Sequence, residues 1–116
     1  MTIAEIITNY SSQYQNPITL VKGQIVTLGK TPDEEKWKGW IWAENSTQGG
    51  WVPLQILNIA DNLLTAEVLE DYSAKELDVE EGEEVYVVQH LNGWVLAQHK
   101  SSGEEGWIPD ENLIFK

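Results

Sequence analysis

The chain contains two copies of one sequence pattern, and this repeat constrains the fold more than any other feature. The stretch "AEIITNYSSQYQNPITLVKGQ" (4–24) matches "AEVLEDYSAKELDVEEGEE" (66–84), and "GWIWAENSTQGGWVP" (39–53) matches "GWVLAQHKSSGEEGWIP" (93–109). The matched residues keep their order, and the differences in length fall between them, where loops tolerate insertions. A repeat of this kind indicates two structural units of the same type.

Each copy is typical of a set of short β-strands. "QIVTLG" (24–29) and "EVYVVQ" (84–89) alternate apolar and polar residues and are rich in β-branched side chains. A second strand and a polar turn follow in both copies, which favours local hairpins, and no window predicts an amphipathic helix. We therefore predict an all-β fold of two consecutive small barrels, over residues 1–59 and 63–116, joined by a short linker.

Composition excludes several classes of function. The chain has 116 residues and no cysteine, so it has no disulfide framework and no thiolate nucleophile or metal ligand. Its net charge is −12, with seven lysines and no arginine, which disfavours nucleic acid as a partner. No apolar run approaches the roughly 20 residues that span a bilayer. We expect an acidic, cytoplasmic protein with no membrane partner, no cofactor and no metal site.

The charge is also divided unevenly between the copies. Residues 1–60 hold five acids and four lysines, a net charge of −1, whereas residues 61–116 hold fourteen acids and three lysines, a net charge of −11. Such asymmetry predicts two units with different surfaces.

The repeated motifs resemble the Src-homology-3 (SH3) family, in its variant form. The second copy carries "VLEDY", "LDVEEGEE", "NGWVLA" and "GWIPDENL", and the first carries "IITNY", "ITLVKGQ", "GWIWA" and "GWVPLQIL". Both series follow the order of the family's motifs, and together they cover nearly the whole chain. The resemblance implies small β-barrels that hold an extended, proline-rich peptide in a shallow aromatic groove.

Carried over position by position, the resemblance implies a set of groove residues in each copy. These are Tyr10, Tyr14, Trp40, Trp51 and Pro53 in the first copy, and Tyr72, Trp94, Trp107 and Pro109 in the second. Two groove rings of the family are replaced in each copy. The first ring is Thr8 in one copy and Glu70 in the other, and the closing ring is Ile56 or Asn112.

The family also places an acid in its first loop, where it pairs with a basic residue of the ligand. Glu76 stands nearest to this position in the second copy, whereas Pro17 occupies it in the first. The first copy has its acids in the next loop instead, at Asp33, Glu34 and Glu35. Trp42, which aligns with Leu96 of the second copy at an inward-alternating position, is expected to lie in the core.

The leading hypothesis is a non-enzymatic protein-interaction module that binds an extended, proline-containing or basic peptide mainly through the first copy. The alternative is a structural subunit whose altered grooves are buried between the domains or in a homodimer. A third interpretation is an aromatic cage for a modified lysine. Catalysis is the least favoured class, because the chain has no nucleophile elbow and no phosphate-binding loop.

Overall fold

The structure, a computed structural model, describes residues 2–13, 16–33 and 38–116. Over these residues the fold is all-β apart from two short 3-10 turns, as predicted. No helix in the described part of the chain is long and apolar enough to cross a membrane.

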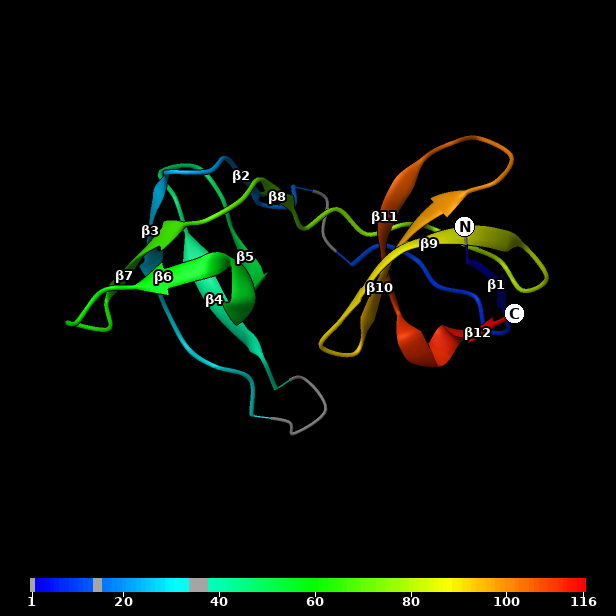
Figure 1. Cartoon of the computed structure of the whole chain (residues 1–116), viewed down its shortest axis with the longest axis horizontal. Coiled ribbons are helices and arrows are strands. Elements are labelled where there is room, and N and C mark those ends of the chain that lie inside the picture. The colour runs from blue at the N-terminus through cyan, green and yellow to red at the C-terminus, as the bar shows by residue number, and fades with distance from the viewer. Residues whose placement is uncertain (1, 14–15, 34–37) are drawn as a thin grey trace. The chain divides into compact units, whose positions relative to one another are not determined.

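Two five-stranded antiparallel sheets organise the chain, each in its own compact unit (Figure 1). One sheet has the order β11-β10-β9-β1-β12 and the other the order β5-β4-β3-β7-β6. The strands of the first sheet are β1 (Ile3–Ile6), β9 (Glu84–Leu91), β10 (Trp94–His99), β11 (Glu105–Pro109) and β12 (Leu113–Phe115). Those of the second are β3 (Ile25–Leu28), β4 (Trp40–Glu44), β5 (Gly49–Pro53), β6 (Leu57–Ile59) and β7 (Thr65–Val68).

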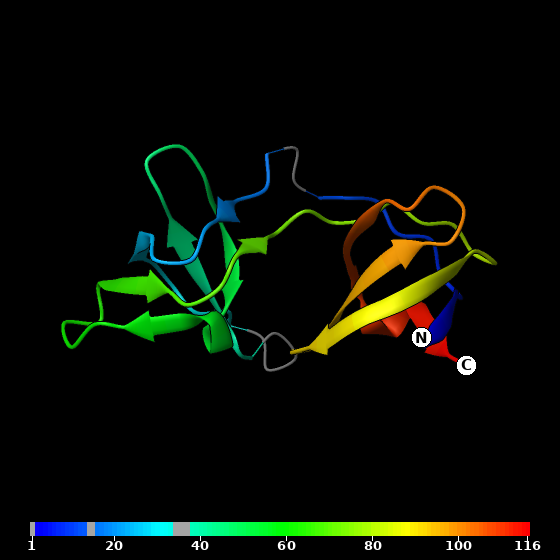
Figure 2. The same ribbon diagram turned by 45° about the horizontal axis from the view of Figure 1, so that its top comes forward.

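Each unit takes its first strand from the other sequence copy. Unit 1 consists of Met1–Gln15 and Lys75–Lys116, so β1 of the first copy lies between β9 and β12 of the second. Unit 2 consists of Asn16–Ala74, so β7 of the second copy lies between β3 and β6 of the first. Both views show the blue strand β1 beside the yellow strand β9 and the red strand β12 (Figure 2).

The register of the strands documents this exchange. In unit 1, Glu5 lies opposite Glu84 on β9, and Ile6 lies opposite Leu113 on β12. In unit 2, the equivalent Glu67 lies opposite Ile25 on β3. The compact units therefore do not follow the predicted ranges 1–59 and 63–116, which describe the sequence repeats. The physical reason is that the first strands of the two copies have the same pattern, so either can complete either barrel.

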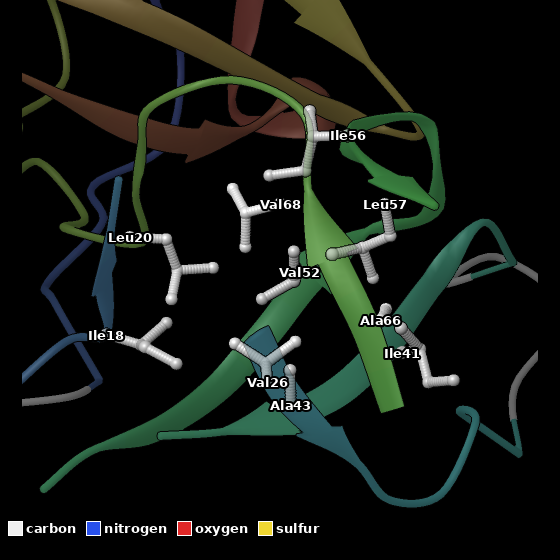
Figure 3. Packing of buried hydrophobic residues seen from close by; sticks show 10 residues of the cluster. All are labelled: Ile18, Leu20, Val26, Ile41, Ala43, Val52, Ile56, Leu57, Ala66 and Val68. Atoms are coloured by element: carbon white, nitrogen blue, oxygen red, sulfur yellow. The ribbon is translucent and has the colours of Figure 1, made fainter. Parts of the chain in front are cut away.

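The cores of the two units show the same mixing of copies. Figure 3 shows Ala66 and Val68, from the second copy, turned toward Val26 and Val52 of the first. The whole cluster is Ile18, Leu20, Val26, Ile41, Ala43, Val52, Ile56, Leu57, Ala66 and Val68. In unit 1 the buried cluster joins two residues of the first copy to seven of the second: Ala4, Ile6, Leu77, Val79, Val85, Val95, Ala97, Ile108 and Leu113.

The exchange gives the two units different chain paths. Unit 2 is one continuous segment whose ends meet, because strand β2 (Thr19–Leu20) pairs with strand β8 (Tyr72–Ser73). The amide of Ala74 also donates to the carbonyl of Ile18 over 2.9 Å. Unit 2 is thus a barrel in permuted strand order, inserted into unit 1 after Gln15.

Equivalent turns have equivalent backbone geometry in the two units. Gly23 and Gly82, which precede β3 and β9, both have φ of +93°, a region that favours glycine. The "NG" of the second copy forms the two-residue turn between β9 and β10, and both its residues have positive φ (50° at Asn92 and 87° at Gly93).

Candidate functional site

Unit 1 brings Tyr10 of the first copy to Trp94 of the second. Tyr10 is anchored by a backbone bridge to Val79, in which each residue's amide donates to the other's carbonyl over 2.9 Å. Trp94 is the first residue of β10 and follows the tight turn. The two ring centroids lie 6.0 Å apart at an interplanar angle of 81°, an edge-to-face pair, and both residues are partly exposed.

Glu76 adds a carboxylate to this aromatic pair. It accepts a hydrogen bond from the backbone amide of Gln13 over 2.7 Å and another from the Tyr10 side chain. Burial raises the pKa of the Glu76 carboxyl above its ordinary value. The two hydrogen bonds act in the opposite direction, and the charge of Asp78 adds to the rise. The site therefore joins an aromatic edge and an acid that is only partly exposed.

The segment that carries Glu76 is held closely against β11. Glu76 forms a parallel bridge with Trp107, whose amide donates to the Lys75 carbonyl over 2.9 Å. A Cβ atom on Gly106 would lie 2.8 Å from the backbone carbon of Glu76 and from the amide nitrogen of Leu77. A glycine at this position allows the approach, and the acid is thereby placed by the barrel itself.

Two predicted contact residues of unit 1 are buried, and a third position has changed its role. Trp107 is 5% exposed, and Pro109 is also buried, so neither offers much surface to a ligand. Asn112, which replaces the closing ring of the family, is 8% exposed. Its side-chain amide donates to the carbonyls of Thr8 and Asn9 over 3.3 and 3.2 Å, so it fastens the exchanged segment to the end of the barrel.

Unit 2 contains four further predicted contact residues, Trp40, Trp51, Pro53 and Tyr72. Trp40 is only 6% exposed and Pro53 is fully buried. Tyr72, supplied by the second copy, is partly buried and its hydroxyl donates to the carbonyl of Trp51 over 3.2 Å. The strand exchange places Tyr10 in unit 1, whereas Trp40 and Pro53 belong to unit 2, so the predicted groove residues of the first copy are divided between the two units.

Trp42 does not lie in the core, contrary to expectation. On β4 its neighbours Ile41 and Ala43 are buried, so the strand's alternation turns Trp42 to the outer face. There it meets Trp51, with ring centroids 5.4 Å apart at 84°, and its indole N–H donates to Glu44. The expectation assigned Trp42 to the wrong face of the strand. Trp51, which lies opposite Trp42 on β5, could have indicated from the sequence that the two rings form a pair on the outer face.

Of the predicted residues not yet described, the structure describes only Asp33. Asp33 is exposed. Tyr14, Glu34 and Glu35 lie outside the described residues. Among the residues that the structure describes, no group of three or more histidine, aspartate and glutamate side chains could hold a metal ion.

Family models match both halves of the chain in succession. The model of the variant SH3 domain matches residues 5–60, and that of the SH3 domain matches residues 69–110. The chain is a tandem of two SH3 domains. It is 30% identical over 123 aligned positions to the human "SH3 and PX domain-containing protein 2B". The match covers 93% of this chain but only 13% of that much longer protein.

Proposed function

We propose that this tandem SH3 protein is a non-enzymatic interaction module that binds an extended peptide at the Tyr10–Trp94 pair. SH3 domains are protein-interaction modules, and the human relative is also named for such domains. The observation that carries the proposal is the partly exposed aromatic pair with Glu76 hydrogen-bonded beside it. We place the site here rather than in the first copy, because the exchange assigns Tyr10 and Trp40 of that copy to different units.

The chemistry of the site favours a proline-containing peptide with a basic residue. Proline rings pack on flat aromatic faces, and a polyproline II segment is already extended, so it loses little entropy on docking. A carboxylate beside the rings can pair with a lysine or arginine of the ligand. Unit 1 holds eleven acids and three lysines, a net charge of −8, which would also steer a basic partner toward it. Because the chain has no cysteine, and so needs no oxidising compartment, we also propose that it works in the cytoplasm.

The burial of Trp40 and Trp107 favours a second candidate function for those two rings. With 6% and 5% of their surfaces exposed, they contribute to packing rather than to a free binding surface. Unit 2 would then be a structural domain, inserted between the two segments of unit 1. A homodimer that covers the aromatic residues belongs to the same hypothesis.

An NMR titration of the full chain tests the proposal. We expect a proline-rich peptide that contains one arginine to shift the resonances of Tyr10, Glu76 and the Trp94 indole, and the same peptide with alanine for arginine to bind more weakly. The variant Glu76→Gln should remove most of this difference while keeping the Gln13 hydrogen bond. Glu44→Gln, in unit 2, is the matched control. Shifts confined to unit 2, or none at millimolar peptide, would contradict the proposal.

A further inference from the structure

The two first strands are interchangeable by pattern, yet each pairs with the other copy. Ala4-Glu5-Ile6 and Ala66-Glu67-Val68 place a small and a branched apolar side chain in the cores. Tyr10 and Tyr72 follow at the same spacing. Apolar packing therefore does not decide whether each first strand pairs with the other copy, as observed (exchanged pairing), or with its own copy (consecutive pairing). The choice must come from positions at which the two segments differ.

Two matched positions differ in charge, Thr8/Glu70 and Asn9/Asp71, and the side-chain oxygens of the second pair contact the partner barrel directly. Asn9 and Asp71 both stand immediately before the shared tyrosine. The side-chain oxygen of Asn9 accepts a hydrogen bond from the amide of Glu81 over 2.6 Å. That of Asp71 accepts one from the amide of Lys22 over 2.9 Å. The neutral residue thus meets an acidic turn, and the acid meets a turn that carries a lysine.

Consecutive pairing would reverse both matches. Asp71 would then occupy the place of Asn9, at the turn that holds Glu80, Glu81 and Glu83, and like charges this close repel. Asn9 would meet Lys22 without any charge attraction.

The net charges of the two units also favour exchanged pairing. The exchanged units carry −8 in unit 1 and −4 in unit 2, the latter from eight acids and four lysines. A division at residue 60 gives −1 and −11. Self-repulsion within a unit grows roughly with the square of its net charge, so the exchanged distribution lowers the self-repulsion summed over the two units.

We propose that the residues at positions 9 and 71 determine which first strand completes which barrel. Asn9 admits β1 to the acidic turn of unit 1, and Asp71 directs β7 to the turn of unit 2 that contains Lys22. This role is independent of peptide binding. It makes Asn9 and Asp71 specificity residues for pairing within the chain rather than ligand contacts.

Disulfide competition in the full chain can measure the pairing, since the natural chain has no cysteine. Glu5 faces Glu84 in the exchanged arrangement, and its partner in the consecutive one would be the equivalent residue Ile25. The adjacent pair Ile6–Glu83 carries the backbone hydrogen bond, so Glu5 and Glu84 form a non-hydrogen-bonded pair. Such pairs have Cα atoms about 4.5 Å apart, which suits a disulfide.

The triple variant Glu5→Cys, Ile25→Cys, Glu84→Cys is equilibrated in a glutathione buffer and its disulfides are mapped by mass spectrometry. We expect a monomer with a 5–84 disulfide in clear excess over 5–25. Adding Asn9→Asp with Asp71→Asn should shift the ratio toward 5–25 by roughly three- to tenfold. The control, Asp61→Asn with Asn62→Asp, makes the same two kinds of substitution within one exposed turn, moves no charge from one copy to the other, and should leave the ratio unchanged.

A salt series on the triple variant alone gives a second readout that needs no further substitution. The excess of 5–84 should shrink between 0.01 and 1 M salt, because the Debye length falls from about 30 to about 3 Å. A ratio that changes neither with the position 9 and 71 substitutions nor with salt would overturn the proposal. A covalent dimer in place of the monomer would also overturn it, because pairing would then occur between chains.

Discussion

Replacing Ile6 by alanine should weaken unit 1 and leave unit 2 intact, although Ile6 belongs to the first sequence copy. Its side chain is fully buried in the unit 1 core, among residues of the second copy that include Val79 and Ile108. Truncating a buried isoleucine to alanine costs about 2–5 kcal/mol, since it removes apolar contact and leaves a cavity. Such a loss is a large part of the stability of a barrel this small.

Native-state amide hydrogen exchange, followed residue by residue, separates the two units. We expect protection in β9, β10 and β11 to fall roughly 30-fold to several thousand-fold, which corresponds to 2–5 kcal/mol. Protection in β3, β4 and β5 should not change. The control Val68→Ala removes one carbon fewer at the equivalent position and should show the converse pattern, with a smaller loss confined to unit 2. If Ile6→Ala instead weakened β3 to β5, the assignment of β1 to unit 1 would be refuted.

Three further outcomes follow from the structure. The isolated segment 16–74 should fold cooperatively, because unit 2 is continuous and its ends pair; a flat, poorly dispersed NMR spectrum of this fragment would contradict that. Gly106→Ala should cost about 1–3 kcal/mol in denaturant unfolding of unit 1, since the added methyl would lie 2.8 Å from backbone atoms; an unchanged midpoint would show that the segment at Glu76 can move away. The folded pKa of Glu76 is raised above its ordinary 4.5, so the folded state binds more protons there and stability should fall as pH rises from 4.5 through that pKa. Glu76→Gln should flatten this slope in unfolding curves between pH 4 and 7, and a wild-type protein that gained stability relative to the variant over this range would contradict the sign.

The fold class could be predicted from the sequence because it depends on patterns that repeat. Alternating strands, turn glycines such as Gly23 and Gly82, and the paired "GWVP" and "GWIP" motifs predict two SH3 barrels, and the structure and family models confirm them. These signals are local. They describe which strands exist but not which strands pair across the chain.

The composition of each unit could not be predicted, because the two first strands satisfy the same local rules. The assignment of Tyr10 and Trp40 to different units follows directly from that ambiguity, and so does the contact of Tyr10 with Trp94. Trp42 illustrates a second limit. A tryptophan in the middle of a strand fits either face, and only the buried neighbours Ile41 and Ala43 show which face is the core.

A single NMR measurement tests the strand exchange most directly. In antiparallel sheets the Hα atoms of a non-hydrogen-bonded pair are close enough to give a strong nuclear Overhauser effect. The exchanged structure predicts such Hα–Hα effects between Glu5 and Glu84 and between Glu67 and Ile25. Effects between Glu5 and Ile25 and between Glu67 and Glu84 would instead show two barrels built from consecutive residues, and would contradict the account.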